Sequence, residues 1–257
     1  MSYWDTAIRC VEEVKGILLS GFHEEKIIEH KGEVDLVTSV DKAVEEKVID
    51  IITVEHPDHD IMAEESGLTK ESKGDYLWII DPLDGTTNYA HNFPHFSLSI
   101  GLEYKGEKVF GLVYQPIADE LFIAEKGSGA FLNDRRITVS RVSQLSQSLL
   151  GTGFPYDRQR NAELYTTELK TLMEKAQGIR RPGVASLDLC YLACGRYDGF
   201  WERKLHPWDV AAGILIVKEA GGMVTNQTGA DFHYSDELII ASNGLIHHEM
   251  LNILNKP

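Results

Sequence analysis

An apolar run that ends in two aspartates around a proline is the feature that most constrains the fold of this chain. Residues 76–80 read Tyr-Leu-Trp-Ile-Ile, and residues 81–86 continue as Asp-Pro-Leu-Asp-Gly-Thr. A short apolar run bounded by turn residues is typical of a buried strand. Pro82 fixes φ and removes a backbone donor, so we expect the chain to leave the strand in a stiff turn. Such a turn can direct two carboxylates and the Leu83 carbonyl at one point.

The chemistry of this turn suits a divalent cation beside a phosphate. Magnesium prefers a rigid octahedron of oxygen ligands and keeps waters that a phosphate can replace. Gly85 permits close backbone approach, and a helix that begins at Gly85 and Thr86 would present free N–H groups to an anion. The alternative is an ordinary turn, because Asp-Pro and Asp-Gly are common turn dipeptides. The six residues in this order favour the cation and phosphate interpretation.

Other carboxylates occupy positions from which they could join the same site. Glu64 and Glu65 end a second predicted strand, and the two strand ends can meet if both belong to one sheet; for Glu65 a solvated acidic loop is an equal alternative. Asp209 lies at the start of a helix predicted over 208–220, where a carboxylate can also serve as a cap or dipole partner. The small residues 211–213 would let this helix pack closely against a neighbour.

Asp41 has two possible roles. With Thr38 it forms a predicted capping box at the start of a helix, and from the residues alone that structural role is the stronger one. A catalytic role requires that Asp41 lie near the turn at residues 81–86.

The order of predicted elements indicates a layered α/β (α+β) fold. A helix over 2–20 and a second helix after Thr38 precede the buried strand, and the short apolar runs between residues 96 and 132 predict an antiparallel sheet. Strands and helices alternate after residue 148, which predicts a mixed sheet. We therefore expect a single domain over 1–257, with two halves joined near the polar segment 141–148.

Composition excludes several classes of protein. The chain has 257 residues, of which 43% are hydrophobic, so it can bury a core without disulfides. Its formal net charge of −15 argues against direct nucleic-acid binding, which uses basic surfaces. No apolar stretch reaches the roughly 20 residues of a membrane span, and the first residues lack the pattern of a signal peptide. With only three cysteines, these features predict a cytoplasmic location.

The motifs together resemble one family. "DPLDGTT", a downstream "WDVAAG" and an upstream "EES" are similar to those of the inositol monophosphatase family of magnesium-dependent, lithium-sensitive phosphomonoesterases. The resemblance, to bacterial members above all, runs from "VDLVTSVD" through "LDLCYLACGRYDGFWE" to "EAGG" and covers nearly the whole chain. It implies the sugar-phosphatase fold, with alternating layers of helices and sheets, and a homodimer.

The resemblance also implies a metal site with two to three Mg²⁺ ions, or Mn²⁺ in their place. Glu64, Asp81 and the Leu83 carbonyl would hold the first ion. Asp81, Asp84 and Asp209 would hold the second, and a third would depend on Glu64 and water.

The remaining roles implied by the resemblance concern the attacking water, the phosphate and the substrate. Asp41 and Thr86 would orient and deprotonate the water, and the Gly85 and Thr86 amides would hold the phosphate. Lys31 would lie near the entrance. The substrate hydroxyls would meet Asp84, the backbone near Ala185, Glu202 and Asp209.

These roles imply hydrolysis of a small phosphomonoester by metal-activated water, with inositol monophosphate as the first expected substrate. Fructose 1,6-bisphosphate, 3'-phosphoadenosine 5'-phosphate and histidinol phosphate are alternatives. A role as a partner of the transcription machinery is an alternative of another class. Two residues depart from the family pattern, Ala63 where glycine is usual and Val184 where serine or threonine is common. The second departure removes a hydroxyl near the expected substrate site, so the identity of the substrate is less well determined than the chemistry.

Overall fold

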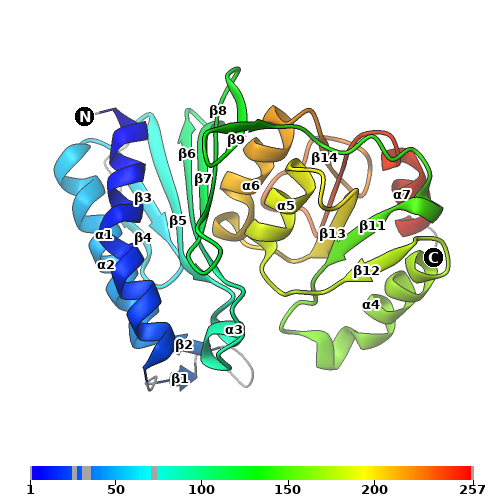
Figure 1. Ribbon diagram of the computed structural model, residues 1–257, viewed down its shortest axis with the longest axis horizontal. Coiled ribbons are helices and arrows are strands. Elements are labelled where there is room, and N and C mark those ends of the chain that lie inside the picture. Colours follow the sequence, from blue (N-terminus) through cyan, green and yellow to red (C-terminus); the bar gives the residue numbers. More distant parts are fainter. Residues whose placement is uncertain (1, 25–27, 31–35, 71–73, 256–257) are drawn as a thin grey trace.

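Helices and sheets alternate in layers across the molecule (Figure 1). The computed structural model describes residues 2–24, 28–30, 36–70 and 74–255. Helices α1 (Tyr3–His23) and α2 (Ser39–Glu55) cover the outer face of the first sheet, and α5 (Ala185–Ala193) and α6 (Pro207–Glu219) lie between the two sheets. Helices α4 (Arg158–Met173) and α7 (His247–Leu254) cover the far side of the second sheet. The layered fold class predicted from the sequence is confirmed.

Within the described residues, the first large sheet has the strand order β10-β9-β8-β7-β6-β5-β3-β4. Its strands are β3 (Asp60–Ala63), β4 (Gly67–Lys70), β5 (Tyr76–Asp84), β6 (Ser97–Tyr104), β7 (Glu107–Gln115), β8 (Glu120–Glu125), β9 (Gly129–Leu132) and β10 (Arg135–Ile137). A separate pair, β1 (Ile28–His30) and β2 (Leu36–Thr38), lies before α2.

The sequence predicted an antiparallel sheet in the first half of the chain. The first sheet departs from this prediction at one pair of strands, because β3 and β5 run parallel. The reason is the hairpin between β3 and β4, which places β4 on the outer edge of β3. The chain then returns on the other side of β3, so β5 has the same direction as β3. The Glu64 end of β3 thereby lies beside the Asp81 end of β5, where the Glu64 N–H donates to the Ile80 carbonyl (3.1 Å).

The second sheet has the order β12-β11-β13-β15-β14. Strand β11 pairs in parallel with both β12 and β13, so the loops after these three strands leave from the same edge of the sheet. The short strand β12 was not predicted. The strands of this sheet are β11 (Leu149–Thr152), β12 (Gly178–Arg180), β13 (Gly199–Arg203), β14 (Met223–Asn226) and β15 (Leu238–Ser242).

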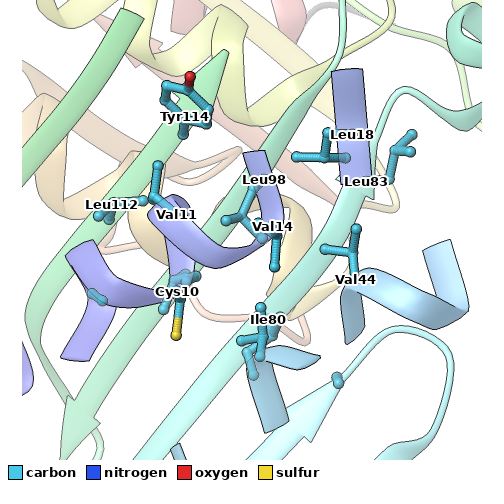
Figure 2. Packing of buried hydrophobic residues seen from close by; sticks show 14 of the residues in the cluster. Cys10, Val11, Val14, Leu18, Val44, Ile80, Leu83, Leu98, Leu112 and Tyr114 are labelled. Atoms are coloured by element: carbon cyan, nitrogen blue, oxygen red, sulfur yellow. The ribbon is translucent and has the colours of Figure 1, made fainter. Parts of the chain in front are cut away.

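The outer face of the first sheet is covered by an apolar stripe on each of two helices. Figure 2 shows Val11, Val14 and Leu18 of α1 with Val44 of α2 near Ile80 and other sheet residues. All of these side chains are buried. Helix α2 begins with the predicted capping box of Thr38 and Asp41.

Helix α6 approaches the inner face of the first sheet very closely. A Cβ atom on Gly101 of β6 would lie 2.8 Å from the Ala211 Cβ, and a Cβ on Gly111 of β7 would lie 2.7 Å from the Ala212 carbonyl oxygen. On its other side, a Cβ on Gly213 would lie 2.6 Å from Leu189 of α5. The prediction that residues 211–213 permit close packing is confirmed. Among the described residues, no helix is long and apolar enough to cross a membrane.

Replacing Gly111 with alanine tests this close packing. The added methyl group meets the backbone of α6, which cannot rotate away, so Gly111→Ala should lower the free energy of unfolding by about 1–3 kcal/mol. Gly16 is a matched control, because a Cβ there meets no atom within 4 Å and alanine favours a helix by about 0.5–1 kcal/mol over glycine. Denaturant unfolding should show Gly16→Ala as stable as wild type or more so. An equally stable Gly111→Ala protein would contradict the packing argument.

Candidate active site

A cavity of about 340 Å³ opens where the end of β5, the start of α6 and the loops after β11, β12 and β13 meet. Nearly all of the site residues expected from the sequence line it. They are Glu64, Asp81, Leu83, Asp84, Gly85, Thr86, Ala185, Glu202 and Asp209. Asp41 lies behind Thr86, fully buried. Lys31 lies outside the described residues.

The sequence predicted that the strand ends before the turn at Asp81. In the structure, β5 continues to Asp84, and the two aspartates lie in a bulge of this strand. Asp81 pairs with Ser99 of β6 and Asp84 with Ser97, so three steps along β5 match two along β6. Pro82 lacks the N–H that a continuous ladder requires, which favours a bulge at this position. The Leu83 N–H donates to Asp81 Oδ1 (3.0 Å) and fixes that carboxylate.

A helix begins directly after the bulge, as predicted. Helix α3 (Thr86–Ala90) has Gly85 as its N-cap, with φ of 95°. A side chain at this φ is strained, and a Cβ would also lie 2.7 Å from a methyl group of Val184. Val184 is fully buried against Gly85. The valine therefore packs beneath the turn, which explains why an apolar side chain is accepted at this position.

Asp41 both caps α2 and contacts the candidate site. Its Oδ2 accepts from the Thr38 N–H (2.9 Å) and hydroxyl (2.5 Å), and its Oδ1 accepts from the Thr86 hydroxyl (2.9 Å). Burial raises the pKa of Asp41, and the hydrogen bonds from Thr38 and Thr86 oppose that shift. Because the Thr86 hydroxyl donates to Asp41, its lone pairs remain able to accept from a water in the cavity. The sequence offered two roles for Asp41, and the geometry is compatible with both.

The carboxylates of the cavity raise one another's pKa. Burial raises the pKa of Asp81 well above its usual range, and the negative charges of Glu64, Asp84 and Asp209 raise it further. Burial and the Asp84 charge act in the same way on Asp209. Burial raises the pKa of Asp84 to about 6, although the Ser186 N–H, which donates to Asp84 Oδ2 (2.8 Å), opposes the shift. Cations near these groups would remove the repulsion.

The donor set of the cavity fits hard divalent cations. Carboxylates and the Leu83 carbonyl are all oxygen ligands, which Mg²⁺ prefers, and Mg²⁺ usually retains several waters. Within the described ranges, no three His, Cys, Asp or Glu side chains already lie close enough together to hold an ion, so a cation shared by Asp81, Asp84 and Asp209 would have to draw their carboxylates together. The arrangement therefore suits ions that each take a few protein oxygens and complete their shell with water or substrate.

Asp209 is placed by the start of α6. The His206 N–H donates to its Oδ2 (2.6 Å), and His206 and Asp209 form a capping box. The sequence left capping and metal binding open as alternatives for Asp209. The capping hydrogen bond uses Oδ2, and Asp209 still lines the cavity. Capping of α6 therefore does not exclude metal binding by the same side chain.

Glu202 lies at the end of β13 against a glycine. A Cβ on Gly153 would lie 2.0–2.2 Å from the carboxyl atoms of Glu202, so the Glu202 carboxyl packs directly on the Gly153 backbone. Burial raises the pKa of Glu202 to about 8, against the opposing effect of Arg181. Gly153 was not identified from the sequence, because nothing local to residue 153 indicates a partner some fifty positions away.

Other cavity residues were also missed. Asn88 Nδ2 donates to the carbonyls of His95 (2.8 Å) and Pro182 (2.9 Å) and links α3 to the loop after β12. Arg158 and Arg181 line the cavity as well. Glu65, whose role the sequence left open, is absent from the lining of this cavity; its N–H donates to Glu45 (2.8 Å).

The layered fold and a cavity of carboxylates beside a helix N-terminus are features of a phosphate-processing hydrolase. Residues 2–256 match the inositol monophosphatase family. The inositol-1-monophosphatase of Rhizobium meliloti is 42% identical over 88% of this chain and 85% of its own. The Nus factor SuhB of Pseudomonas aeruginosa is 46% identical over 84% and 81%. The crystal structure of the suppressor protein suhB from Bartonella henselae superposes with a TM-score of 0.95, at 39% identity over 100% and 99%. The chain belongs to the inositol monophosphatase family.

Gly153→Ala tests the placement of Glu202. The new methyl group must displace the Glu202 carboxyl, so kcat/KM for inositol monophosphate, the substrate after which the family is named, should fall about tenfold. If Glu202 binds a substrate hydroxyl, as the resemblance implies, turnover of an aryl phosphate without ring hydroxyls should change much less, because a site that binds a hydroxyl discriminates through the partner it leaves unpaired. Adding Glu202→Asp, whose shorter side chain makes room for the methyl, should recover part of the loss. Equal losses on both substrates without recovery would contradict this role for Gly153.

Proposed function

We propose that the protein is a magnesium-dependent phosphomonoesterase whose first substrate is inositol monophosphate. The observation that carries the proposal is the convergence of oxygen ligands from separate parts of the chain on one cavity. Glu64 follows β3, Asp81 and Asp84 belong to the β5 bulge, and Asp209 begins α6. Inositol monophosphatases are phosphoric monoester hydrolases, and family membership supports this class of reaction.

Two to three divalent cations, Mg²⁺ or Mn²⁺, would be held by these carboxylates. Glu64, Asp81 and the Leu83 carbonyl would hold one ion, and Asp81, Asp84 and Asp209 a second. When bound, such ions lower the pKa of water and neutralise charge on a phosphoryl group.

The residues of this chain then bind and orient the reactants. Thr86 accepts a hydrogen bond from the attacking water and donates its own proton towards Asp41, which is 2.9 Å away. Asp41 is buried, so it is protected from bulk water while it holds a proton. The Gly85 and Thr86 N–H groups at the start of α3 bind the phosphate. Asp84, the backbone of Ala185, Glu202 and Asp209 contact the hydroxyls of the substrate.

Further properties belong to the same proposal. We expect a cytoplasmic homodimer that is inhibited by lithium. Fructose 1,6-bisphosphate, 3'-phosphoadenosine 5'-phosphate and histidinol phosphate remain alternative substrates. A second function as a partner of the transcription machinery is favoured by one observation, the high identity to relatives named Nus factor SuhB.

Phosphate release from a panel of phosphomonoesters tests the proposed function. The protein should hydrolyse inositol monophosphate only when a divalent cation is present, because the carboxylates alone cannot activate water or bind a dianion. Dialysis against a chelator should abolish turnover, and Mg²⁺ should restore it. Full activity in a metal-free preparation, or no activity on any member of the panel with Mg²⁺, would contradict the proposal.

Asp81→Asn should abolish turnover and stabilise the metal-free protein. The pKa of Asp81 in the folded state lies well above its ordinary value of about 3.9, so folding takes up a proton wherever the unfolded carboxyl is ionised. The stability of the metal-free wild type therefore decreases as the pH rises above about 4, and the variant lacks this contribution. Its Tm should exceed that of wild type at pH 8 and differ little at pH 4.

The control for this substitution is Asp50→Asn, because Asp50 is exposed on α2. The control should retain activity and show no such pH-dependent difference in Tm. Near wild-type turnover of Asp81→Asn would mean that Asp81 is only a turn residue.

A further inference from the structure

Asp188 is a buried carboxyl that the proposed chemistry does not use. It lies in the first turn of α5 with no exposed surface, and its neighbours Leu187 and Leu189 belong to an apolar cluster between the two sheets. Among the described residues, neither oxygen of the Asp188 carboxyl has a hydrogen-bond partner. Because buried polar groups are nearly always hydrogen-bonded, this carboxyl requires a partner other than the side chains and backbone packed around it.

Capping of α5 does not explain Asp188. A carboxylate near the start of a helix is favourable in general, and Asp188 is an acidic residue of the first turn. The free N–H of Ser186, however, donates to Asp84 (2.8 Å), and the N–H of Asp188 donates to the Val184 carbonyl (3.0 Å). Asp84 therefore caps the start of this helix, and the carboxyl of Asp188 takes no part in it.

Glu202 lies on the face of the second sheet that α5 covers. Successive side chains of a strand alternate between the two faces of a sheet. Along β13, Phe200 belongs to the apolar cluster with α5, whereas Trp201 belongs to the cluster with α7. Arg203 lies on the same face as Trp201 and donates to Glu168 of α4 (2.6 Å). Glu202 thus shares the face of Phe200, against which α5 packs (Figure 1).

The side chain of Asp188 points towards the cavity end of α5. The Cα–Cβ bonds of a helix tilt towards its N-terminus, and residues three apart lie on one face. Ala185 is three positions before Asp188, and it lines the cavity together with Glu202. Asp188 therefore lies one helical turn beneath the cavity lining, on the side from which Glu202 enters it.

The surroundings of Asp188 keep it a neutral acid. Burial raises its pKa well above the usual range, and the negative charges of Glu202 and Asp84 raise it further, against the opposing effect of Arg181. Glu202 is less enclosed, because it lines the cavity and is only half-buried, so it carries a negative charge more readily than Asp188 does. A proton shared between these two carboxyls therefore lies on Asp188.

We propose that Asp188 is a positioning residue for Glu202, whose carboxylate accepts a hydrogen bond from the neutral Asp188 carboxyl through one buried water. The inference rests on the proposed function and deepens it, because it adds a residue that determines how a substrate hydroxyl is recognised. Buried waters commonly join polar groups in this way. A hydrogen bond to the charged form of Glu202 favours that form. The other lone pairs of the carboxylate then remain for substrate hydroxyls.

Asp188→Leu and Asp188→Asn separate the donor from the charge. Leucine removes an unpaired buried polar group at little change in size, so the fold should be as stable as wild type or more so. It should lower kcat/KM for inositol 1-phosphate on the order of tenfold, mainly through KM, because it weakens a binding contact. Turnover of phenyl phosphate, which has no ring hydroxyl, should change less than about threefold. Asparagine keeps a donor in the same place and should retain kcat/KM for inositol 1-phosphate within about threefold.

Leu192→Met is the matched control. Leu192 lies one turn further along the same face of α5 and is equally buried, and the exchange conserves volume. The control should leave the ratio of the two kcat/KM values unchanged. An unchanged ratio in Asp188→Leu would overturn the role of Asp188, and so would a loss in Asp188→Asn as large as that in Asp188→Leu. Turnover of inositol 1-phosphate by wild type would still support the proposed function in either case.

A double-variant cycle tests whether Asp188 acts through Glu202. With Glu202→Gln already present, adding Asp188→Leu should change kcat/KM for inositol 1-phosphate less than about threefold, because the group that Asp188 positions is already altered. Independent effects that multiply would overturn the link between the two residues. Failure of the wild type to hydrolyse any phosphomonoester with Mg²⁺ would instead overturn the proposed function.

Infrared spectroscopy detects the proton on Asp188 without turnover. The difference spectrum between wild type and Asp188→Asn, both with Mg²⁺ at neutral pH, should contain the carbonyl stretching band of a protonated carboxyl. This band should shift when the solvent is exchanged for D₂O. A carboxylate band in its place would overturn the proposal, even if Asp188→Leu failed to fold.

Discussion

The close contact of α6 with the first sheet determines where the candidate site can form. Gly101 and Gly111 lack the side chains that would hold α6 away, and Ala211 and Ala212 fill the space with backbone and methyl groups. Asp209 lies at the start of this helix and therefore at the end of β5, beside a bulge that presents two further carboxylates. On the other side of α6, Gly213 has no side chain, so α5 can pack closely against it. The N–H of Ser186 in α5 then donates a hydrogen bond to Asp84. Small side chains in the middle layer thus bring carboxylates from both halves to one cavity.

This arrangement opposes the stability of the metal-free protein. Asp81 is almost fully buried, and its neighbours carry the same charge. Such a group persists where the surrounding structure fixes it, here through the bulge, the Leu83 N–H and the two caps at Asp41 and Asp209. Cations would convert this repulsion into binding free energy, which links metal affinity to the fold itself. The local elements therefore serve the chemistry and the architecture together.

The sequence predicted what depends on neighbouring residues. Four features depend only on residues close together in the sequence. They are the capping box of Thr38, the buried strand before Asp81, the helix after Gly85 and the small residues of α6. The sequence did not predict the parallel pairing of β3 with β5, because that depends on which edge of a sheet a returning strand joins. The places of Gly153 beside Glu202 and of Arg158 and Arg181 in the cavity lining were not predicted either. The role of each of these residues depends on a contact or a cavity formed by segments that are far apart in the sequence. The spacing of neighbouring residues gives no sign of such a contact.

The most direct test of the account is anomalous diffraction from crystals that contain Mn²⁺ and inorganic phosphate. The account predicts at least two anomalous peaks in the cavity, both in contact with Asp81, one also near Glu64 and the Leu83 carbonyl and the other near Asp84 and Asp209. Phosphate density should lie against the N-terminus of α3. A cavity without anomalous peaks, or peaks that leave Asp81 without a ligand role, would contradict the claim that the β5 bulge and α6 converge in order to bind metal.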